Sequence, residues 1–311
     1  MISSKHYGFR PGFTTFDCLI DLIEEITSSL DKGLYVISLF LDLSKAFDTV
    51  NHQISLNKLK YYGLQQSEYN GFQSYLSNRK KQVHSNGVAS DIRFIPTGVP
   101  QGSILGPLLF TIFINDLPKS STFFSTRLYA DDTSSTASGS DLNSLLREIN
   151  NHLPAVYEWL CNNKLIVNFT KTKFLIFMPR QKESYNLYPP LTVANVHFEK
   201  SFCVKYLGVY IDCHLTWHDH IDYICGKMSK NINIMVKLKH YVSKGTLARV
   251  YYSLIYPYLT YACTLSGNNY SAPLFQIVKL QNKVVRDIND VPLMESITPH
   301  HTSLYTCFIS I

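Results

Sequence analysis

The sequence predicts an α+β protein in which a unit built on a β-sheet precedes a helical unit. Two observations lead to this prediction. Strand and helix patterns are mixed over the first two thirds of the chain, and from His218 onward the pattern is helical. Strands and helices in this order are typical of α+β proteins. We place the boundary between residues 214 and 215, and because no Pro/Gly-rich linker lies there, we expect the two parts to pack together.

The first elements are two helices on either side of a buried strand. Residues Phe16–Leu30 place their apolar side chains on one side of a helix. The run Leu34–Leu41 is apolar, rich in branched and aromatic residues and free of Gly and Pro, which predicts a strand buried on both faces. A helix over Asn51–Tyr62 follows, with Gly63 as its C-terminal cap, and residues 64–98 mix a short helix with strands.

The later elements include a hairpin and a long helix. We expect a helix over Leu105–Asp116 and a hairpin over Arg127–Ala137. Asp141 can cap a helix that reaches Asn163, although Pro154 should kink or divide it. The remaining expected elements are strands at Leu165–Phe169, Phe174–Met178 and Tyr206–Ile211, a loop at Gln181–Pro190, and helices near 218–240, 244–258 and 272–288.

Composition indicates a globular protein with an uneven positive charge. A hydrophobic content of 45% with 17% charged residues excludes a disordered chain. The net charge is +6, and residues Tyr223–Arg249 contain six Lys/Arg and no acid. Such a segment suits a polyanion, and nucleic acid is the natural candidate. The alternative is a solvated basic helix.

The cysteines and apolar runs bear on the cellular location. Seven irregularly spaced cysteines without a Cys-x-x-Cys pair indicate reduced thiols in an intracellular protein. Residues Cys213–Cys225 contain two Cys and three His, but their spacing matches no standard zinc finger. The longest apolar run, Ile104–Ile114, is too short to span a bilayer, and nothing resembles a signal peptide, so we expect a soluble protein.

Two acidic segments suggest a metal site. The sequence Tyr129–Asp132 (YADD) places two adjacent acids, Asp131 and Asp132, at the bend of the expected hairpin. Adjacent acids repel each other, and a divalent cation such as Mg²⁺ compensates for that repulsion. Asp42 ends the first buried strand, where it can meet the hairpin, and such carboxylates can hold two cations about 3.5–4 Å apart for nucleotidyl transfer. The alternatives are acids in a solvated turn and, for Asp42, a helix N-cap.

A glycine-rich loop lies between the two acidic segments. Residues Gly98–Ser103 lead into the helix over Leu105–Asp116, Ser103 can cap that helix, and Pro107 falls in its first turn. We expect the apolar face of this helix to consist of Leu105, Leu108, Leu109 and Ile112. Such a loop lets backbone approach a nucleotide or template. The alternative is an ordinary loop before a core helix.

Taken in order, these three segments resemble the reverse transcriptases of LINE-type (non-LTR) retrotransposons, most closely the jockey-like ones. The resemblance extends from Tyr7 to about Val285 and includes the motifs Tyr7–Arg10, Tyr75–Lys80, Asn168–Lys173 and Tyr206–Asp212. It implies an RNA-directed DNA polymerase with a right-hand architecture. The palm, an antiparallel sheet with packed helices, and partial fingers would occupy residues 1–214, and a helical thumb would occupy residues 215–311.

The resemblance also implies a metal-dependent reaction. Asp42 and Asp131 would be the principal ligands of two Mg²⁺ ions, with Mn²⁺ as the alternative ion. Asp132 would support them, and the backbone carbonyl of Leu43 would complete one coordination sphere. Lys171 would protonate the pyrophosphate leaving group, although Lys173 is a competing candidate.

Further residues would contact the substrates, which are an RNA template, a DNA primer and dNTPs. Phe47 would lie under the incoming sugar and favour dNTPs over rNTPs by collision with a 2′-hydroxyl, unless it is a core residue. Gln101 and Gly102 would lie beside the templating base pair. The nucleic-acid contacts implied are those of Arg79, Lys80 and Gly208. Solvated charges for Arg79 and Lys80, and a β-bulge for Gly208, remain as alternatives.

The chain departs from the family pattern at both ends. It begins in mid-pattern at Met1, without upstream fingers strands, and the resemblance is lost from about Thr298, so we expect an N-terminally truncated fragment of an open reading frame. A catalytically inactive remnant that only binds nucleic acid is therefore a second hypothesis. A nucleotide cyclase is a third, which the loop Gly98–Ser103 and the basic helical tail argue against.

Overall fold

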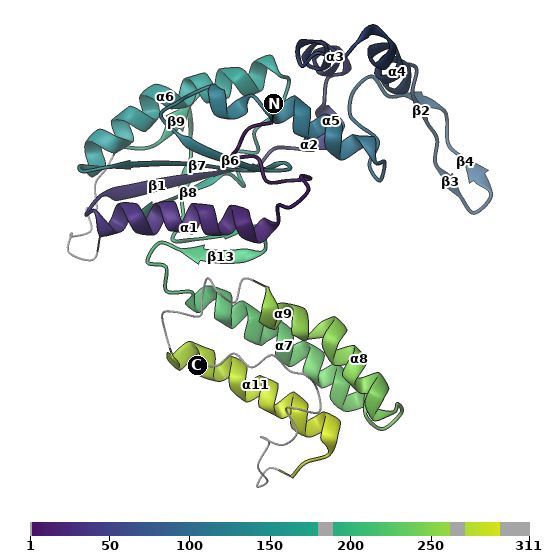
Figure 1. The fold of residues 1–311 in the computed structure, drawn as a ribbon, viewed down its shortest axis with the longest axis vertical. Helices are drawn as coiled ribbons and strands as arrows, with labels where there is room; N and C mark the ends of the chain where they lie inside the picture. The colour runs from purple at the N-terminus through teal and green to yellow at the C-terminus, as the bar shows by residue number, and fades with distance from the viewer. Residues whose placement is uncertain (1, 180–188, 262–270, 293–311) are drawn as a thin grey trace. The chain divides into compact units, whose positions relative to one another are not determined.

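The computed structural model describes residues 2–179, 189–261 and 271–292, which form two compact units, Met1–Phe202 and Cys203–Ile311 (Figure 1). Most of the loop expected at Gln181–Pro190 and the C-terminal end from Thr298 lie outside the described residues. The units divide twelve residues before the boundary that we expected at 214/215. The reason is that the carboxylate of Asp212 accepts backbone N–H groups of His214, Thr216 and Trp217, which joins the preceding hairpin to the helices after it.

The first unit is built on a five-stranded sheet in the order β11-β8-β1-β7-β6. Strand β1 (Tyr35–Leu41) is central and pairs antiparallel with β7 (Asp132–Gly139) and β8 (Lys173–Phe177). On the outer sides, β6 (Ser125–Tyr129) is antiparallel to β7, and β11 (Glu199–Lys200) is parallel to β8. The expected mixture of strands and helices is confirmed.

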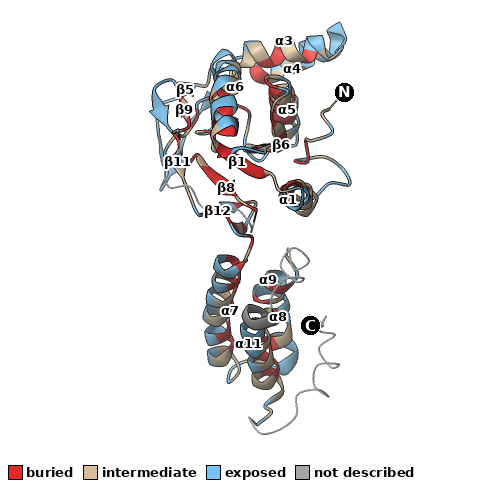
Figure 2. Ribbon diagram, turned by 90° about the vertical axis from the view of Figure 1, so that its left-hand side faces the viewer, coloured by how far each residue is buried: buried red, intermediate tan, exposed pale blue. Residues whose placement is uncertain are grey.

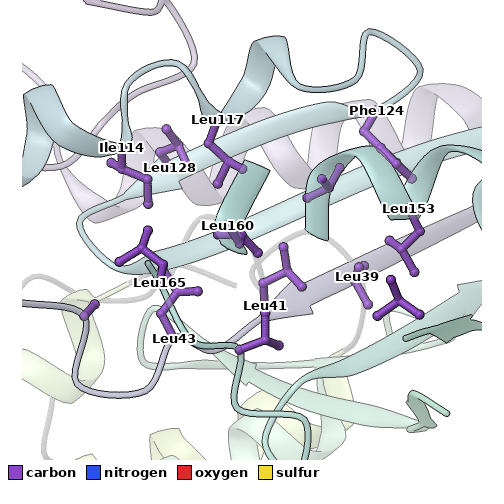
Figure 3. Packing of buried hydrophobic residues seen from close by; sticks show 14 of the residues in the cluster. Leu39, Leu41, Leu43, Ile114, Leu117, Phe124, Leu128, Leu153, Leu160 and Leu165 are labelled. Atoms are coloured by element: carbon purple, nitrogen blue, oxygen red, sulfur yellow. The ribbon is translucent and has the colours of Figure 1, made fainter. Parts of the chain in front are cut away.

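Helices cover both faces of this sheet, as Figure 1 shows for α6 (Leu142–Asn162) and α1 (Thr15–Asp31). Alternate residues of β1, including Leu39 and Leu41, join the core beneath α6 (Figure 3). The other residues of the strand, such as Val36 and Phe40, point to the opposite face, which α1 covers, and they are buried too. Every residue of β1 is therefore buried, as expected, and Figure 2 shows the strand in red.

Strand β7 is polar yet buried. Four consecutive hydroxyl residues, Thr133–Thr136, are at most 2% exposed. Two of their hydroxyl groups pair across the sheet, Thr136 with Ser38 at 3.0 Å and Ser135 with Thr126 at 2.9 Å. Small side chains that bond to each other let the strand that carries the acidic turn lie between two neighbours.

The remaining elements of the first unit surround this sheet. A short hairpin arm extends from the helices after β1, and its strands β2 to β5 are exposed throughout (Figure 1). The elements are α2 (Ala46–Thr49), α3 (His52–Tyr61), α4 (Gln66–Leu76), β2 (Lys80–Lys81), β3 (His84–Ser85), β4 (Val88–Ala89), β5 (Arg93–Phe94), α5 (Leu105–Ile114), the 3₁₀ helix η1 (Leu117–Lys119), β9 (Thr192–Val193) and β10 (Val196–His197).

Three local predictions need correction. Helix α6 continues through Pro154, because this residue lies on the exposed side of the helix, where water can reach the carbonyl that loses its partner. Leu108 of α5 is 43% exposed, whereas Phe110 and Phe113 are buried. Helix α5 is apolar on all sides, so periodicity could not identify its inner face. Residues Leu165–Phe169 form a loop that contributes one antiparallel bridge, Leu43 to Val167, and no strand.

The second unit begins with the hairpin β12 (Cys203–Tyr206) and β13 (Val209–Asp212), where we expected one strand over Tyr206–Ile211. Leu207 and Gly208, both with positive φ, form its turn. Helix α7 (His218–Leu238) packs against α8 (Lys244–Leu254), α9 (Tyr256–Thr260) and α11 (Ser271–Asn289). None of the described helices has the length and apolar character needed to cross a membrane.

Candidate active site

The pairing register of the sheet brings the two acidic segments together. Leu41, the last residue of β1, pairs with Thr133, so the next step along both strands sets Asp42 beside Asp132. On the other side of β7, Tyr129 pairs with Asp132, which leaves Ala130 and Asp131 as the two-residue turn. Ala130 has φ +55°, an uncommon value for a residue with a side chain.

The electrostatics of Asp132 reflect this proximity. Burial raises the pKa of Asp132, and the negative charges of Asp131 and Asp42 raise it further, to about 6. The side chain lies at the end of β7 and still reaches solvent, so burial is incomplete. The charges of the two neighbouring acids contribute to this raised pKa, so Asp132 lies within electrostatic range of both Asp131 and Asp42.

A loop on the opposite side holds Asp42 in place. Its backbone N–H donates to the hydroxyl of Thr172 at 3.1 Å, and its carbonyl accepts the N–H of Asn168 at 2.9 Å. Thr172 is fully buried. The sequence motif Asn168–Lys173 thus packs against the end of β1, a role for Thr172 that sequence reasoning missed.

Lys171 and Lys173 differ in their surroundings. Lys171 is exposed on this same loop and forms no ion pair with the described residues. Lys173 starts β8, and its ammonium group lies 3.3 Å from a carboxylate oxygen of Glu199. Lys171 directly precedes Thr172, which binds the backbone of Asp42, and of the two lysines only Lys173 forms an ion pair with a described residue.

The segments around Phe47 and Gln101 also meet. The ring of Phe47 stacks on Phe110 with centroids 4.4 Å apart, and the Phe47 carbonyl accepts the N–H of Val99. The side-chain amide of Gln101 donates to the carboxylate of Asp48 at 3.1 Å. Gly102 follows on the exposed side of the same loop. Phe47 is half-buried, so one part of its ring is in the core and another part is accessible.

The donor set suits a hard divalent cation, because carboxylate oxygens are the preferred ligands and the mutual repulsion at Asp132 would be relieved by positive charge. The carboxylates of Asp42, Asp131 and Asp132 do not, however, surround a common point in the structure. Within the described ranges, no three His, Cys, Asp or Glu residues are arranged to hold a metal ion. The Cys and His residues of the segment Cys213–Cys225, all of them described, are therefore not arranged to hold a metal ion either.

Comparison with known proteins shows to which family the chain belongs. The profile of the family described as "Reverse transcriptase (RNA-dependent DNA polymerase)" matches residues 1–211, two thirds of the chain. The chain belongs to the reverse transcriptase family. The expected similarity to reverse transcriptases of non-LTR, jockey-like retrotransposons is confirmed, and members of this family generally use divalent metal ions and act on nucleic acid.

Three relatives of the chain come from mobile elements of Drosophila. The chain is 27% identical, over 98% of its length, to the probable RNA-directed DNA polymerase from transposon BS of Drosophila melanogaster, and 29% identical over 92% to that from transposon X-element. It is 28% identical over 94% to the RNA-directed DNA polymerase from mobile element jockey of Drosophila funebris. The chain spans about a third of the length of these proteins, 34%, 32% and 32%.

A solved structure of telomerase from Candida tropicalis, in complex with a fragment of telomeric RNA, is more distantly similar. The two chains are 10% identical with a TM-score of 0.46, over 99% of this chain and 54% of the other.

Arg79 and Lys80 lie at the base of the exposed arm of this reverse transcriptase. The guanidinium of Arg79 lies 5.8 Å from the ring of Tyr75, and the ammonium of Lys80 lies 5.2 Å from the ring of Phe94. Among the described residues, neither side chain forms an ion pair, so both charges are available to an anionic ligand.

Gly208 belongs to the second unit, at the turn of the β12–β13 hairpin. A Cβ atom at this position would lie 3.3 Å from the ring of Tyr261, and the φ of +82° favours glycine. The space beside Gly208 is therefore occupied by Tyr261 of the same unit. The alternative of a β-bulge is wrong, because this glycine forms a hairpin turn.

Sequence reasoning missed the role of the segment Lys5–Gly8. It runs beside β6, with the N–H of Tyr7 donating to the carbonyl of Leu128 at 2.8 Å and the N–H of Leu128 donating to Lys5 at 3.0 Å. A Cβ atom on Gly8 would lie 2.3 Å from the backbone N of Ala130. Only glycine fits against the acidic turn here. The signal in the sequence was the glycine of the motif Tyr7–Arg10.

Proposed function

We propose that this chain is the polymerase part of an RNA-directed DNA polymerase from a non-LTR retrotransposon, which adds dNTPs to the 3′-hydroxyl of a primer on an RNA template. The observation that carries this proposal is the meeting of Asp42 with Asp131 and Asp132 at one end of the sheet. In the right-hand description, the first unit corresponds to a palm with partial fingers and the helical unit to a thumb, with its beginning near residue 215.

Two Mg²⁺ ions, or Mn²⁺ in their place, would be held by the carboxylates of Asp42 and Asp131 and by the backbone carbonyl of Leu43. The bound ions would supply activation of the primer hydroxyl and neutralisation of the triphosphate. Asp132 would hold the local negative charge that draws a cation to the turn. Its high pKa supports this assignment, because a group that resists ionisation gains most from a nearby cation.

The other residues would orient the substrates and move a proton. Lys171 would donate its proton to the leaving pyrophosphate, a role that its exposed ammonium group permits. Phe47, fixed by its stacking on Phe110, would exclude a 2′-hydroxyl. Gln101 and Gly102 would line the nucleotide position, and Arg79 and Lys80 would contact the phosphate backbone. We do not assign Gly208 a contact with the primer, because Tyr261 occupies the space beside it.

A second candidate function is nucleic-acid binding without catalysis. The observation that favours it is that no three acidic, His or Cys residues of the described ranges close around a common point. In this case the basic residues would still bind a template and primer, whereas the carboxylates would not assemble a working site.

Primer extension distinguishes the two functions. The purified chain is incubated with Mg²⁺, dNTPs and a DNA primer annealed to an RNA template. We expect extension that Asp131→Asn and Asp42→Asn each abolish, with a loss of at least about a thousandfold. Asp31→Asn is the matched control, because this exposed acid at the end of α1 should leave the rate unchanged. Binding without extension would support the second function, and extension retained in both variants would exclude the assigned site.

A further inference from the structure

The second unit contains a cavity of about 610 Å³, a size typical of sites for small ligands. The side chains of Tyr223, Tyr258 and Tyr261 line it together with Gly208 and His220. All of these residues belong to the unit Cys203–Ile311. The described residues that line the cavity therefore come together when this unit folds.

One wall of the cavity is fixed in advance. The hydroxyl of Tyr261 donates a hydrogen bond to the carbonyl of Leu207, and the ring lies beside Gly208, where a Cβ atom would approach it to 3.3 Å. The glycine at the hairpin turn thus makes room for an aromatic ring. A preformed aromatic wall lowers the entropic cost of binding a planar ligand.

The buried histidine supplies unused hydrogen-bonding groups. His220 is 2% exposed, and within the described residues neither of its ring nitrogens has a partner. Burial lowers the pKa of His220 to about 4, so the ring is neutral near pH 7. A neutral imidazole offers one donor and one acceptor, the combination that the edge of a nucleobase also presents.

Two lysines provide positive charge at Tyr223. The ammonium of Lys205 lies 4.9 Å from the centroid of the Tyr223 ring, and that of Lys227 lies 5.5 Å from it. Neither lysine forms an ion pair with a carboxylate in the described part of the chain. Asp212, an acid of the same hairpin as Lys205, accepts three backbone N–H groups.

We propose that this cavity binds one unstacked nucleobase of a single-stranded nucleic acid, with the base against Tyr223, its edge at His220 and the flanking phosphates at Lys205 and Lys227. Aromatic stacking with adjacent positive charge is how proteins hold single strands. The inference rests on the proposed function only in taking nucleic acid as the ligand, and it requires no catalysis. The groups recognised are a base and its flanking phosphates, which single-stranded RNA and DNA share.

The test measures binding of the full chain carrying Asp131→Asn, so that extension plays no part. The probes are ten-nucleotide single strands of uridine and of thymidine, each with a central 2-aminopurine, whose fluorescence falls when the base stacks on an aromatic ring. We expect quenching at saturation, a roughly tenfold weaker affinity with Tyr223→Ala, and near-normal affinity with Tyr223→Phe, because the ring alone provides the stacking. Tyr61→Ala, at a tyrosine of α3 that is 87% exposed, is the matched control.

The outcomes separate this site from the polymerase proposal. Quenching that depends on Tyr223 supports the site for whichever probe shows it, including in a chain that fails to extend primers. Unquenched 2-aminopurine at saturation, or equal affinity of Tyr223→Ala and the parent chain, would overturn it. Equal competition by a duplex of the same length would also overturn it, since paired bases are unavailable. His220→Phe keeps a planar aromatic ring but removes both ring nitrogens, and should weaken binding several-fold; its thermal unfolding is measured alongside.

Discussion

Asp132 is the residue whose ionisation the fold opposes. Its pKa is about 6, above the ordinary 3.8, so the folded chain binds more protons than the unfolded chain between about pH 4 and pH 6. Stability should fall as the pH rises through this window, and above it the folded state carries the whole penalty. Without divalent ions, we expect Asp132→Asn to raise the unfolding free energy at about pH 7.5 by about 1 kcal/mol, a value reduced for solvent screening.

Urea denaturation at about pH 4 and pH 7.5 measures this effect. Asp132→Asn should raise the unfolding free energy at the higher pH. At the lower pH it should leave this free energy unchanged, because Asp132 of the parent chain is protonated in the folded state. Asp91→Asn, at an exposed acid of the arm, should change stability equally at both pH values. A gain of the same size at both would show that the charge of Asp132 is not its source.

The side chain of Phe47 is half-buried, and its ring stacks on that of Phe110. If its accessible part excludes a 2′-hydroxyl, Phe47→Ala should lower the preference for dNTPs over rNTPs by roughly tenfold or more, while some extension with dNTPs persists. Single-nucleotide incorporation with each substrate measures the ratio. Phe275→Ala, an exposed aromatic of α11, is the control. Equal losses for both substrates would mean that Phe47 serves only as a packing residue.

At the scale of elements, the turn between β6 and β7 depends on the segment before α1. Gly8 leaves no room for a Cβ atom, since it would lie 2.3 Å from the N of Ala130. Gly8→Ala should displace the turn that carries Asp131 and lower kcat by about a hundredfold, because small misplacements at a reacting centre are costly. The comparison is with Gly71→Ala in α4, where nothing lies within 4 Å and a gain of about 0.5–1 kcal/mol is expected.

Primer extension and thermal unfolding of both glycine variants give the answer. Gly8→Ala is expected to lose far more rate than stability, which a general loss of folded protein would not produce. A normal kcat in this variant would mean that the turn tolerates the added methyl group and that Gly8 does not position it.

Local patterns predicted the elements themselves with few errors. Apolar runs identified β1, and the predicted cap Asp141, whose side chain accepts the N–H of Ser144, marked the start of α6. The errors arose where local rules compete with tertiary packing. Pro154 stays within a helix because its exposed side is hydrated, and Leu165–Phe169 serves the end of β1 instead of forming a strand.

At the scale of the molecule, the chain forms two cores, one from Met1–Phe202 and one from Cys203–Ile311. The sheet unit buries β1 between α6 and α1, and the helical unit packs α7 against α8 and α11. The boundary between them lies at Phe202/Cys203, because the β12–β13 hairpin joins α7 through Asp212. The change from a strand to a helix pattern in the sequence marks where the helices begin. The hydrogen bonds of Asp212 connect the β12–β13 hairpin to the start of α7, and the sequence pattern does not show them.

The resemblance of the ordered motifs to a known family predicted the family, and local periodicity predicted the α+β character. The acidic segments, also local features, suggested which carboxylates could form a site. The sequence by itself could not give Thr172 under Asp42, Gly8 against Ala130, or Tyr261 beside Gly208. Each of these contacts joins residues that are far apart in the chain. Such contacts are selected by strand register and helix packing, which depend on the whole folded chain and not on any one segment.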